Sequence, residues 1–229
     1  MSLIAEMLVR NEADRYLKEV LTDLETYVDK IIILDNDSID DTYKICQSFN
    51  KVIKLEKSDI DFKIDELGLR SHLLNMSKDI AEDSNWIIAI DADEIFEDKF
   101  KQDVRDLMSK QENNWYSFEI CMFWRGRTHY RIDKLWRTLH AQRMFKYIKD
   151  SDYKLPNKKF GCGHLPISIR ALKGEATKYR MKHLGYADPD DIRKKYDYYM
   201  NQDPEGKFHV LNHIKSIIDE DIILEEWVE

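Results

Sequence analysis

The stretch NWIIAIDADEIFE, residues 85–97, says most about the fold of this chain, because a continuous apolar run ends there in a group of carboxylates. Residues 86–90 have the length and the β-branched content of a strand that is buried on both faces. Asp91, Asp93 and Glu94 follow directly. Carboxylates so close together repel one another unless a cation lies between them or backbone donors bind them. The stretch therefore predicts a buried strand with a polar group at its carboxyl end.

Around this stretch, the first hundred residues alternate between strand-like and helix-like segments. Strands are expected at residues 3–9, 31–34, 52–56 and 86–90, and helices after Asn11 as a cap, after Ser38 and Asp40 as caps, and at residues 65–82. Such alternation predicts a parallel sheet with right-handed crossovers and helices on both faces. Ligands of these sheets bind beyond the carboxyl ends of the strands.

Polar clusters follow three of the expected strands. Residues 10–12 (RNE) follow the first strand, residues 35–38 (DNDS) the second, and residues 91–94 (DADE) the fourth. Because the carboxyl ends of parallel strands meet at one edge of the sheet, we expect these clusters to lie close together.

The second half of the chain has a different pattern. Residues 115–148 are rich in aromatic residues and arginine without a helical period, which favours an antiparallel addition to the sheet. A helix is expected to begin at Asp188, with Pro189 in its first turn. Residues 213–229 are expected to form an amphipathic helix that packs on the body or on a second subunit. No repeat or linker divides the sequence, so residues 1–229 are expected to form a single domain.

Composition limits the classes of function. The 229 residues carry a net charge of −8 and are 43% hydrophobic, which fits a globular protein with a substantial core. The negative charge argues against a nucleic-acid partner that is bound by phosphate neutralisation. Three cysteines at irregular spacing favour a reducing compartment over a disulfide framework. No segment reaches the roughly 18 apolar residues of a membrane span, so we expect a cytoplasmic protein without a transmembrane segment.

The residues alone leave four interpretations of DADE open. The carboxylates cap a turn, or they hold Mg²⁺ or Mn²⁺, which prefer oxygen ligands. In a third interpretation Asp91 accepts a phosphoryl group, as in a phosphatase, although Glu94 stands where such enzymes carry a hydroxyl. The fourth places a zinc site at residues 209–213 (HVLNH), where Val210 replaces the glutamate of metalloproteases.

The order of five motifs resembles glycosyltransferase family 2, the nucleotide-sugar transferases of the GT-A fold. The motifs are LVRNEADRYL (8–17), KIIILDNDSIDDT (30–42), RSHLLNMSKD (70–79), WIIAIDADE (86–94) and MKHLGY (181–186). The resemblance implies an α/β fold: a Rossmann-like, mostly parallel sheet flanked by helices, with a mixed or antiparallel second half and C-terminal helices. It also implies that residues 1–100 bind the nucleotide sugar, residues 101–185 face the acceptor, and residues 186–229 form a helical segment.

The resemblance further implies roles for residues on the donor side. Asn11 and Glu12 match the pair that lies beside the nucleoside. Asp35 and Asn36 match the acidic segment that meets the nucleobase and ribose. Arg70 matches an arginine that approaches the ribose or a phosphate.

Two further motifs imply a metal site. Asp91 and Asp93 match the Asp-x-Asp motif of the family, with Asp93 expected to contact Mn²⁺ or Mg²⁺ and Asp91 the ribose or a water. His183 matches a histidine that completes the metal or diphosphate site. In this interpretation the cation bridges carboxylates and phosphates that would otherwise repel one another.

The catalytic base is the point at which this chain departs from the family. Related sequences often carry an acid directly after a histidine in this region, but here Leu165 follows His164. Asp133 is the favoured base, because its aromatic and arginine neighbours resemble a surface that binds sugars. Glu119 and Glu94 are the alternatives.

The resemblance thus predicts an inverting, metal-dependent glycosyltransferase with a UDP- or GDP-linked donor. The acceptor, whether glycan, lipid-linked or protein, is unknown, and a homodimer is possible. A noncatalytic module that binds nucleotide or glycan is the alternative from another class.

Overall fold

The computed structural model describes residues 1–229 except residues 63, 138, 159–160 and 208–209. In the N-terminal half, strands and helices alternate along the chain: β1 (Leu3–Val9), α1 (Leu17–Tyr27), β2 (Lys30–Asp35), α2 (Thr42–Gln47), β3 (Val52–Lys57), α3 (Glu66–Ile80) and β4 (Trp86–Ala89). β1 pairs in parallel with β2 and β4, and β2 pairs in parallel with β3. The parallel sheet that the sequence predicted is therefore confirmed.

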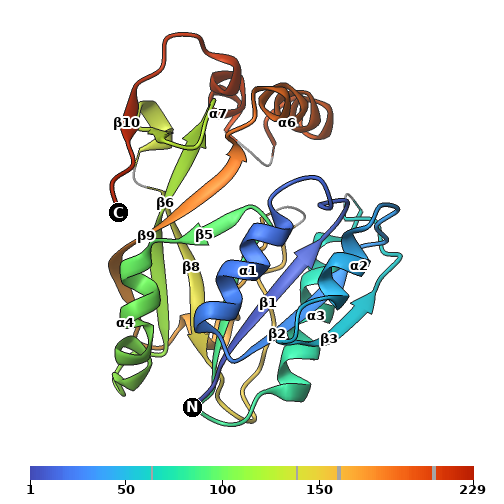
Figure 1. The fold of residues 1–229 in the computed structure, drawn as a ribbon, viewed down its shortest axis with the longest axis vertical. Helices are drawn as coiled ribbons and strands as arrows, with labels where there is room; N and C mark the ends of the chain where they lie inside the picture. Colours follow the sequence, from blue (N-terminus) through green and yellow to red (C-terminus); the bar gives the residue numbers. More distant parts are fainter. Residues whose placement is uncertain (63, 138, 159–160, 208–209) are drawn as a thin grey trace.

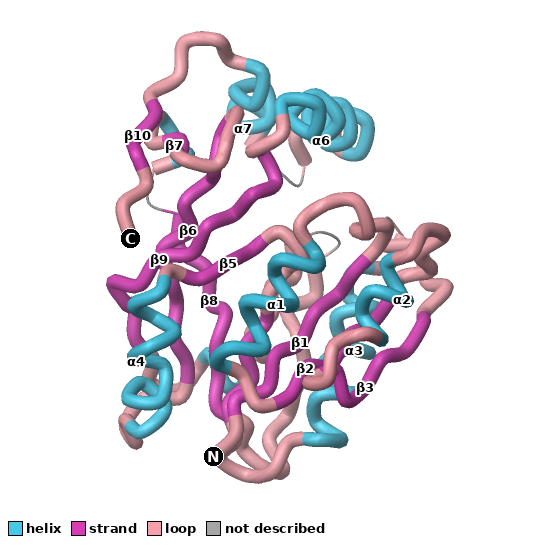
Figure 2. The backbone as a smooth tube through the Cα atoms, in the orientation of Figure 1, coloured by secondary structure: helices cyan, strands magenta, loops and turns pink. Residues whose placement is uncertain are grey.

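The second half extends this sheet. Its elements are β5 (Glu94–Phe96), α4 (Asp98–Ser109), β6 (Trp115–Trp124), β7 (His129–Arg131), η1 (Lys134–Trp136), β8 (Leu139–Lys146), α5 (Ile167–Arg170), β9 (Glu175–Tyr186), α6 (Pro189–Gln202), α7 (Leu211–Lys215), η2 (Ser216–Ile218) and β10 (Leu224–Glu226). β8 joins β4 antiparallel, β6 joins β8 antiparallel, and β9 joins β6 in parallel. Figure 2 shows β6 and β9 running upward from the body to the C-terminal helices.

The β-branched runs pack on both faces of the sheet, which explains why they are continuous rather than alternating. On one face, Leu3 and Ala5 pack in a cluster that also contains apolar residues of α1 and α4. On the opposite face, Ile4 and Ile32 pack against Leu69 of α3. In Figure 1, α1 lies in front of β1 and α3 behind it. Helices therefore cover both faces of the parallel sheet.

The C-terminal segment departs from the prediction. Residues 213–229 do not form one amphipathic helix: α7 and η2 are short, and β10 pairs antiparallel with β7. Trp227 lies 5.5 Å from Phe123 and 6.1 Å from Tyr130 between ring centroids, which places it on the edge of the core. As a strand, β10 pairs with backbone donors and acceptors of β7, which a helix at this position would leave unpaired.

Two predicted helix caps have different outcomes. Asp188 caps α6 as expected, since its Oδ1 accepts from the backbone N–H of Asp190 at 2.9 Å. Asn11 is not a helix cap, because α1 begins only at Leu17. None of the described helices has the length and apolarity that crossing a membrane requires.

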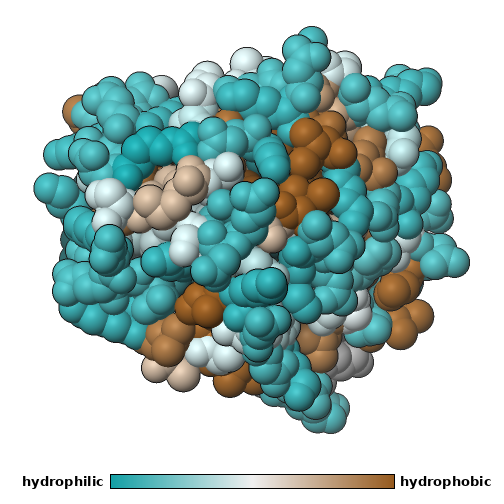
Figure 3. Space-filling model, turned by 90° about the horizontal axis from the view of Figure 1, so that it is seen from below, coloured by the Kyte–Doolittle hydropathy of each residue, from teal (hydrophilic) through white to brown (hydrophobic). Residues whose placement is uncertain are grey.

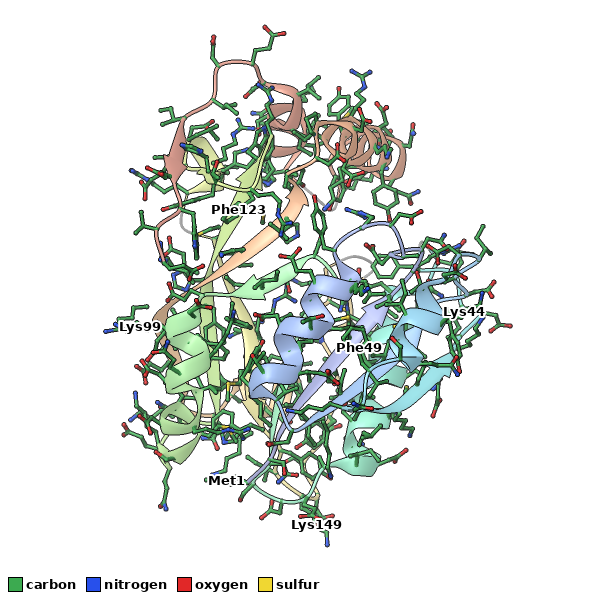
Figure 4. The ribbon with its side chains drawn as sticks, in the orientation of Figure 1. Met1, Lys44, Phe49, Lys99, Phe123 and Lys149 are labelled. Atoms are coloured by element: carbon green, nitrogen blue, oxygen red, sulfur yellow. The ribbon has the colours of Figure 1, made fainter. Side chains whose placement is uncertain are left out.

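One outer face of the molecule is mainly polar. Figure 3, seen from below, shows a largely hydrophilic surface with hydrophobic residues in separate groups. This face lies on the side of Met1 and Lys149 (Figure 4). It lies away from the edge toward which β1 points and where α6 lies (Figure 1).

Candidate functional site at the carboxyl edge of the sheet

A cavity of about 690 Å³ lies between the carboxyl ends of the parallel strands and α6. Six of the predicted site residues line it: Glu12, Asn36, Arg70, Asp91, Asp93 and His183. Lining residues that the sequence did not single out include Arg10, Arg15, Lys195, Tyr198 and Tyr199. The three polar clusters thus meet at one edge, as the rule for parallel sheets predicts.

Asn11 and Asp35, the other two predicted donor-side residues, shape the rim instead of lining the cavity. Asn11 has φ 53° and donates its N–H to Ser38 Oγ at 2.9 Å, while its Oδ1 accepts from Ile39 N at 2.9 Å. Asp35 is fully buried, and its Oδ1 accepts from Ser38 N at 2.7 Å. These bonds tie the loop after β1 to the loop after β2.

The side-chain amide of Asn36 is fixed at one end of the cavity. Its Nδ2 donates to the carbonyl oxygens of Ser58, at 3.2 Å, and Ile60, at 2.5 Å. Both amide protons are thereby used, which sets the orientation of the group. Its Oδ1 accepts a long 3.5 Å bond from Arg10 and keeps acceptor capacity for a ligand.

Asp93, His183 and Lys195 meet at the other end. Asp93 Oδ1 lies 3.8 Å from His183 Nε2, and Asp93 Oδ2 lies 3.6 Å from Lys195 Nζ. The antiparallel pairing of β5 with β9 sets Glu94 opposite His183 and so brings the histidine to the Asp-x-Asp motif. A Cβ atom at Gly185 would fall 2.1 Å from Lys195 Nζ, 2.5 Å from His183 Cε1 and 2.7 Å from Asp93 Oδ2, so a larger residue there would displace this group.

The charges of this group are set by burial and by each other. Burial lowers the pKa of His183 more than Asp93 raises it, so the imidazole is neutral near pH 7. Burial raises the pKa of Asp93, but His183 and Lys195 lower it further, so the carboxylate is ionised. A neutral imidazole and an ionised carboxylate are both able to bind a metal.

The residues at this end fit a divalent cation only when a bound substrate supplies further oxygen ligands. Among the described residues, no group of three His, Cys, Asp or Glu side chains has the arrangement of a metal site. Mg²⁺ is commonly held by one or two carboxylates and the phosphate oxygens of a substrate. Asp93 and His183 supply such a partial set.

Glu12 lines the same cavity and interacts electrostatically with Asp93 and Lys195 of this group. Burial raises the pKa of Glu12 to about 7, with Asp93 adding to the rise and Arg15 opposing it. One carboxylate oxygen, Oε2, is buried without a hydrogen-bond partner among the described residues. Glu12 is therefore poised to change charge near neutral pH.

Asp91 is held by arginines. Arg143 donates to its Oδ2 at 3.2 Å, and Arg70 lies 3.9 Å from its Oδ1. Burial raises the pKa of Asp91, but Arg143 and Arg70 lower it more, so this carboxylate is ionised. Arg143 also donates to Glu94, which is fully buried and whose Oε2 accepts from Asp91 N at 2.9 Å. Arginine thus compensates Asp91. Burial raises the pKa of Glu94 to about 8, with Asp91 and Asp93 adding to the rise and Arg143 opposing it, so Glu94 avoids the repulsion as a protonated acid near pH 7.

A second cavity, of about 360 Å³, adjoins the first at Arg70 and Asp91. It is lined by α3, β8 and the segment that leads to α5, and His164 and Leu165 belong to its wall. Gly161 and Gly163 in this segment have φ 63° and 74°, a backbone region that favours glycine.

Asp133 lies outside both cavities. It forms a bidentate pair with the fully buried Arg131, at 2.7 and 2.9 Å, and its Oδ1 also accepts from Ile223 N. The hydrogen bonds from Arg131 lower the pKa of Asp133, which makes it a weak base. Glu119 and Glu94 line neither cavity. The position of Asp133 therefore does not support the role of acceptor base, and its aromatic neighbours Trp124 and Trp136 are core residues.

The interpretation of residues 209–213 as a zinc site falls partly outside the described residues. His209 lies outside the described residues, and the ring of His213 lies 4.2 Å from that of Trp136.

Comparison with known proteins identifies the family. A sequence profile described as Glycosyl transferase family 2 matches residues 7–173. The chain belongs to this family. No curated protein gave a significant match.

Several solved structures share the fold of this family 2 chain. They include S. aureus TarS (TM-score 0.56, 14% identity, 96% of this chain and 42% of that chain) and TarS 1–349 in complex with UDP (TM-score 0.54, 15% identity, 96% and 70%). TarS 1–349 in complex with UDP-GlcNAc also matches, with TM-score 0.51, 14% identity and coverage of 96% and 71%. The chain thus spans less than half the length of the longer TarS chain. These likenesses confirm the expected GT-A fold.

Proposed function

We propose that this protein is an inverting, metal-dependent glycosyltransferase that moves a sugar from a UDP- or GDP-linked donor to an acceptor hydroxyl. The observation that carries the proposal is the larger cavity of a family 2 chain, which joins the fixed Asn36 amide to the Asp93 and His183 group. The complexes of TarS 1–349 with UDP and with UDP-GlcNAc support a uridine donor.

Asn36 would select the nucleobase. Because its Nδ2 is committed to two carbonyl oxygens, its Oδ1 faces a ligand as an acceptor. The N3–H of uracil and the N1–H of guanine are donors, whereas N3 of cytosine and N1 of adenine are acceptors. The amide oxygen therefore matches the ring N–H of UDP or GDP.

Cationic side chains of the chain itself would receive the diphosphate. Arg15, Arg70 and Lys195 line the cavity, and Lys195 Nζ lies 3.6 Å from Asp93 Oδ2. Asp93 and His183 would hold Mn²⁺ or Mg²⁺, which when bound neutralises the phosphates and stabilises the departing nucleoside diphosphate. Arg70 and Asp91, at the junction of the two cavities, would orient the donor sugar toward the second cavity.

The Asp93→Asn variant tests the proposal. It should weaken Mn²⁺-dependent binding of UDP at least tenfold, because it removes a charged ligand of the cation, while the apo protein stays folded, because the amide keeps the shape of the carboxylate. UDP titrations with and without Mn²⁺, together with apo thermal unfolding, measure both effects. Unchanged Mn²⁺-dependent binding in this variant would contradict the metal assignment.

Asp133→Asn is the matched control. Breaking its pair with buried Arg131 should destabilise the apo protein by about 3 kcal/mol or more. UDP affinity should stay unchanged at temperatures where this variant is folded, since Asp133 lines neither cavity.

A second candidate function is supported by Leu165. It lines the second cavity where related sequences often carry an acid, which favours a noncatalytic nucleotide-binding module. A panel of nucleotide sugars with Mn²⁺ distinguishes the two candidates: hydrolysis or transfer supports the enzyme, and binding without turnover supports the module.

A further inference from the structure

The second cavity carries an excess of positive charge in a chain whose net charge is −8. Its charged lining residues are Arg70, Arg143, Lys158, Arg170, Glu66 and Asp91. Both carboxylates already face Arg70, with Glu66 Oε1 at 2.9 Å from Nε and Asp91 Oδ1 at 3.9 Å from a terminal nitrogen. Arg143 also donates to Asp91 and to the buried Glu94, so Lys158 and Arg170 carry the excess positive charge of this cavity.

Two of these cations, Lys158 and Arg170, lie at the exposed rim. Neither side chain has an ion-pair or hydrogen-bond partner among the residues that the structure describes. The larger cavity, here called the donor cavity, differs in this respect. Its Arg15 pairs with Glu12 and Asp191, and its Lys195 pairs with Asp93. The rim cations are therefore available to a ligand.

At the base of the cavity, guanidinium donors outnumber the acceptors that they face. Arg70 contacts Nδ1 of His164 at 3.1 Å, and Arg143 contacts Nε2 of the same ring. Burial and these two arginines lower the pKa of His164 well below its usual value, so the ring is neutral. A neutral imidazole accepts at only one nitrogen, so one guanidinium faces an N–H. Arg143 Nε, on a side chain that is more than nine-tenths buried, also has no partner among the described atoms.

We propose that the second cavity binds an anionic group, a phosphate or a carboxylate, carried by the acceptor beside its reacting hydroxyl. Arginine offers planar pairs of donors that match either group, and an anion between Arg70, Arg143 and Arg170 supplies the acceptors that His164 lacks. The common border at Arg70 and Asp91 places this anion next to the donor sugar. The inference rests on the proposed transferase function, since it concerns the second substrate of that reaction.

The test is a titration of the full chain already saturated with UDP and Mn²⁺. Glycerol 3-phosphate and glycerate serve as anionic probes, and glycerol serves as the neutral probe. An anionic probe should bind at least tenfold more tightly than glycerol, and the tighter of the two identifies phosphate or carboxylate. Its affinity should fall at least tenfold in the double variant Lys158→Gln, Arg170→Gln.

The matched control removes the same charge elsewhere. Lys99 and Lys178 are exposed cations that line neither cavity, and the double variant Lys99→Gln, Lys178→Gln should bind the probe like the wild type. Equal binding of glycerol and both anions, equal loss in both double variants, or displacement of UDP by the probe would each overturn the inference. Saturation of the wild type with UDP and Mn²⁺ precedes the addition of a probe and does not depend on the inference. Failure of UDP to bind at that step would contradict the proposed function, not the anion site.

Discussion

Glu12 shows how one side chain couples the proposed site to pH. Its carboxyl group faces Arg15, Lys195, Asp93 and Asp191, and burial raises its pKa to about 7. Below this pH the neutral form is compatible with a nearby diphosphate. Above it, the ionised form adds a negative charge beside Asp93 and opposes a dianionic donor.

The affinity of the wild type for UDP-GlcNAc should therefore fall about three- to tenfold as pH rises from 6 to 8.5. The sugar diphosphate itself does not titrate in this range. Glu12→Gln should retain the higher affinity across the range, because an amide cannot ionise. Fluorescence titrations at constant ionic strength measure this, and a pH-dependent loss of the same size in the variant would show that another group is responsible.

At the scale of elements, β1 carries a buried acid against α3. Glu6 is 4% exposed in the middle of β1, and its Oε2 accepts from Ser77 Oγ of α3 at 2.7 Å. Burial raises the pKa of Glu6 from 4.5 to about 7, although the bond from Ser77 and the charge of Arg70 oppose the rise. Burial between the central strand and its helix thus favours the protonated acid, although the hydrogen bond from Ser77 favours the carboxylate.

Protein stability should depend on this proton. With the folded pKa above the unfolded one, the contribution of Glu6 is fully favourable below about pH 4.5 and is lost as pH rises through about 7. Glu6→Gln should therefore unfold like the wild type near pH 4.5, and exceed its free energy of unfolding by up to about 3 kcal/mol at pH 8.

Chemical denaturation at several pH values measures this difference. Glu226→Gln, at an exposed position of β10, is the control and should show no pH-dependent difference from the wild type. A constant difference for Glu6→Gln at all pH values would indicate a packing effect instead of an ionisation.

At the scale of the whole molecule, the donor cavity is built from both halves of the chain. Arg15, before α1, pairs with Asp191 of α6 at 2.9 Å, and Lys195, Tyr198 and Tyr199 of α6 line the cavity opposite the strand ends. Figure 1 shows α6 above the carboxyl edge of the parallel strands. A ligand in this cavity contacts both halves.

UDP with Mn²⁺ should consequently slow amide hydrogen exchange in three separated segments, residues 10–15, 36–40 and 190–200. Lys195→Gln should reduce the protection of residues 190–200 while residues 36–40 stay protected. Hydrogen-exchange mass spectrometry resolves the three segments. Protection confined to the first hundred residues would show that α6 takes no part in donor binding.

Much of the fold follows from local sequence signals. The β-branched runs before Asp35 and Asp91 predict buried parallel strands, and the carboxyl-end rule then predicts the edge at which polar clusters gather. Each of these signals spans only a few neighbouring residues, so a single sequence reveals it. The five family motifs add the GT-A fold, which the comparisons confirm.

The sequence by itself thus determined the parallel sheet, the family and the place of the candidate site, because local apolar patterns mark the buried strands and short motifs mark the family. Only the tertiary structure decided which charges meet there. Arg143 reaches Asp91 through the antiparallel pairing of β8 with β4, and Lys195 reaches Asp93 from a helix about a hundred residues later in the chain. The argument for Asp133 as the base loses its support for the same reason: its neighbours in sequence suggest a sugar surface, but tertiary packing buries Arg131 against it. Long-range register and burial set these partners, and no local pattern records them.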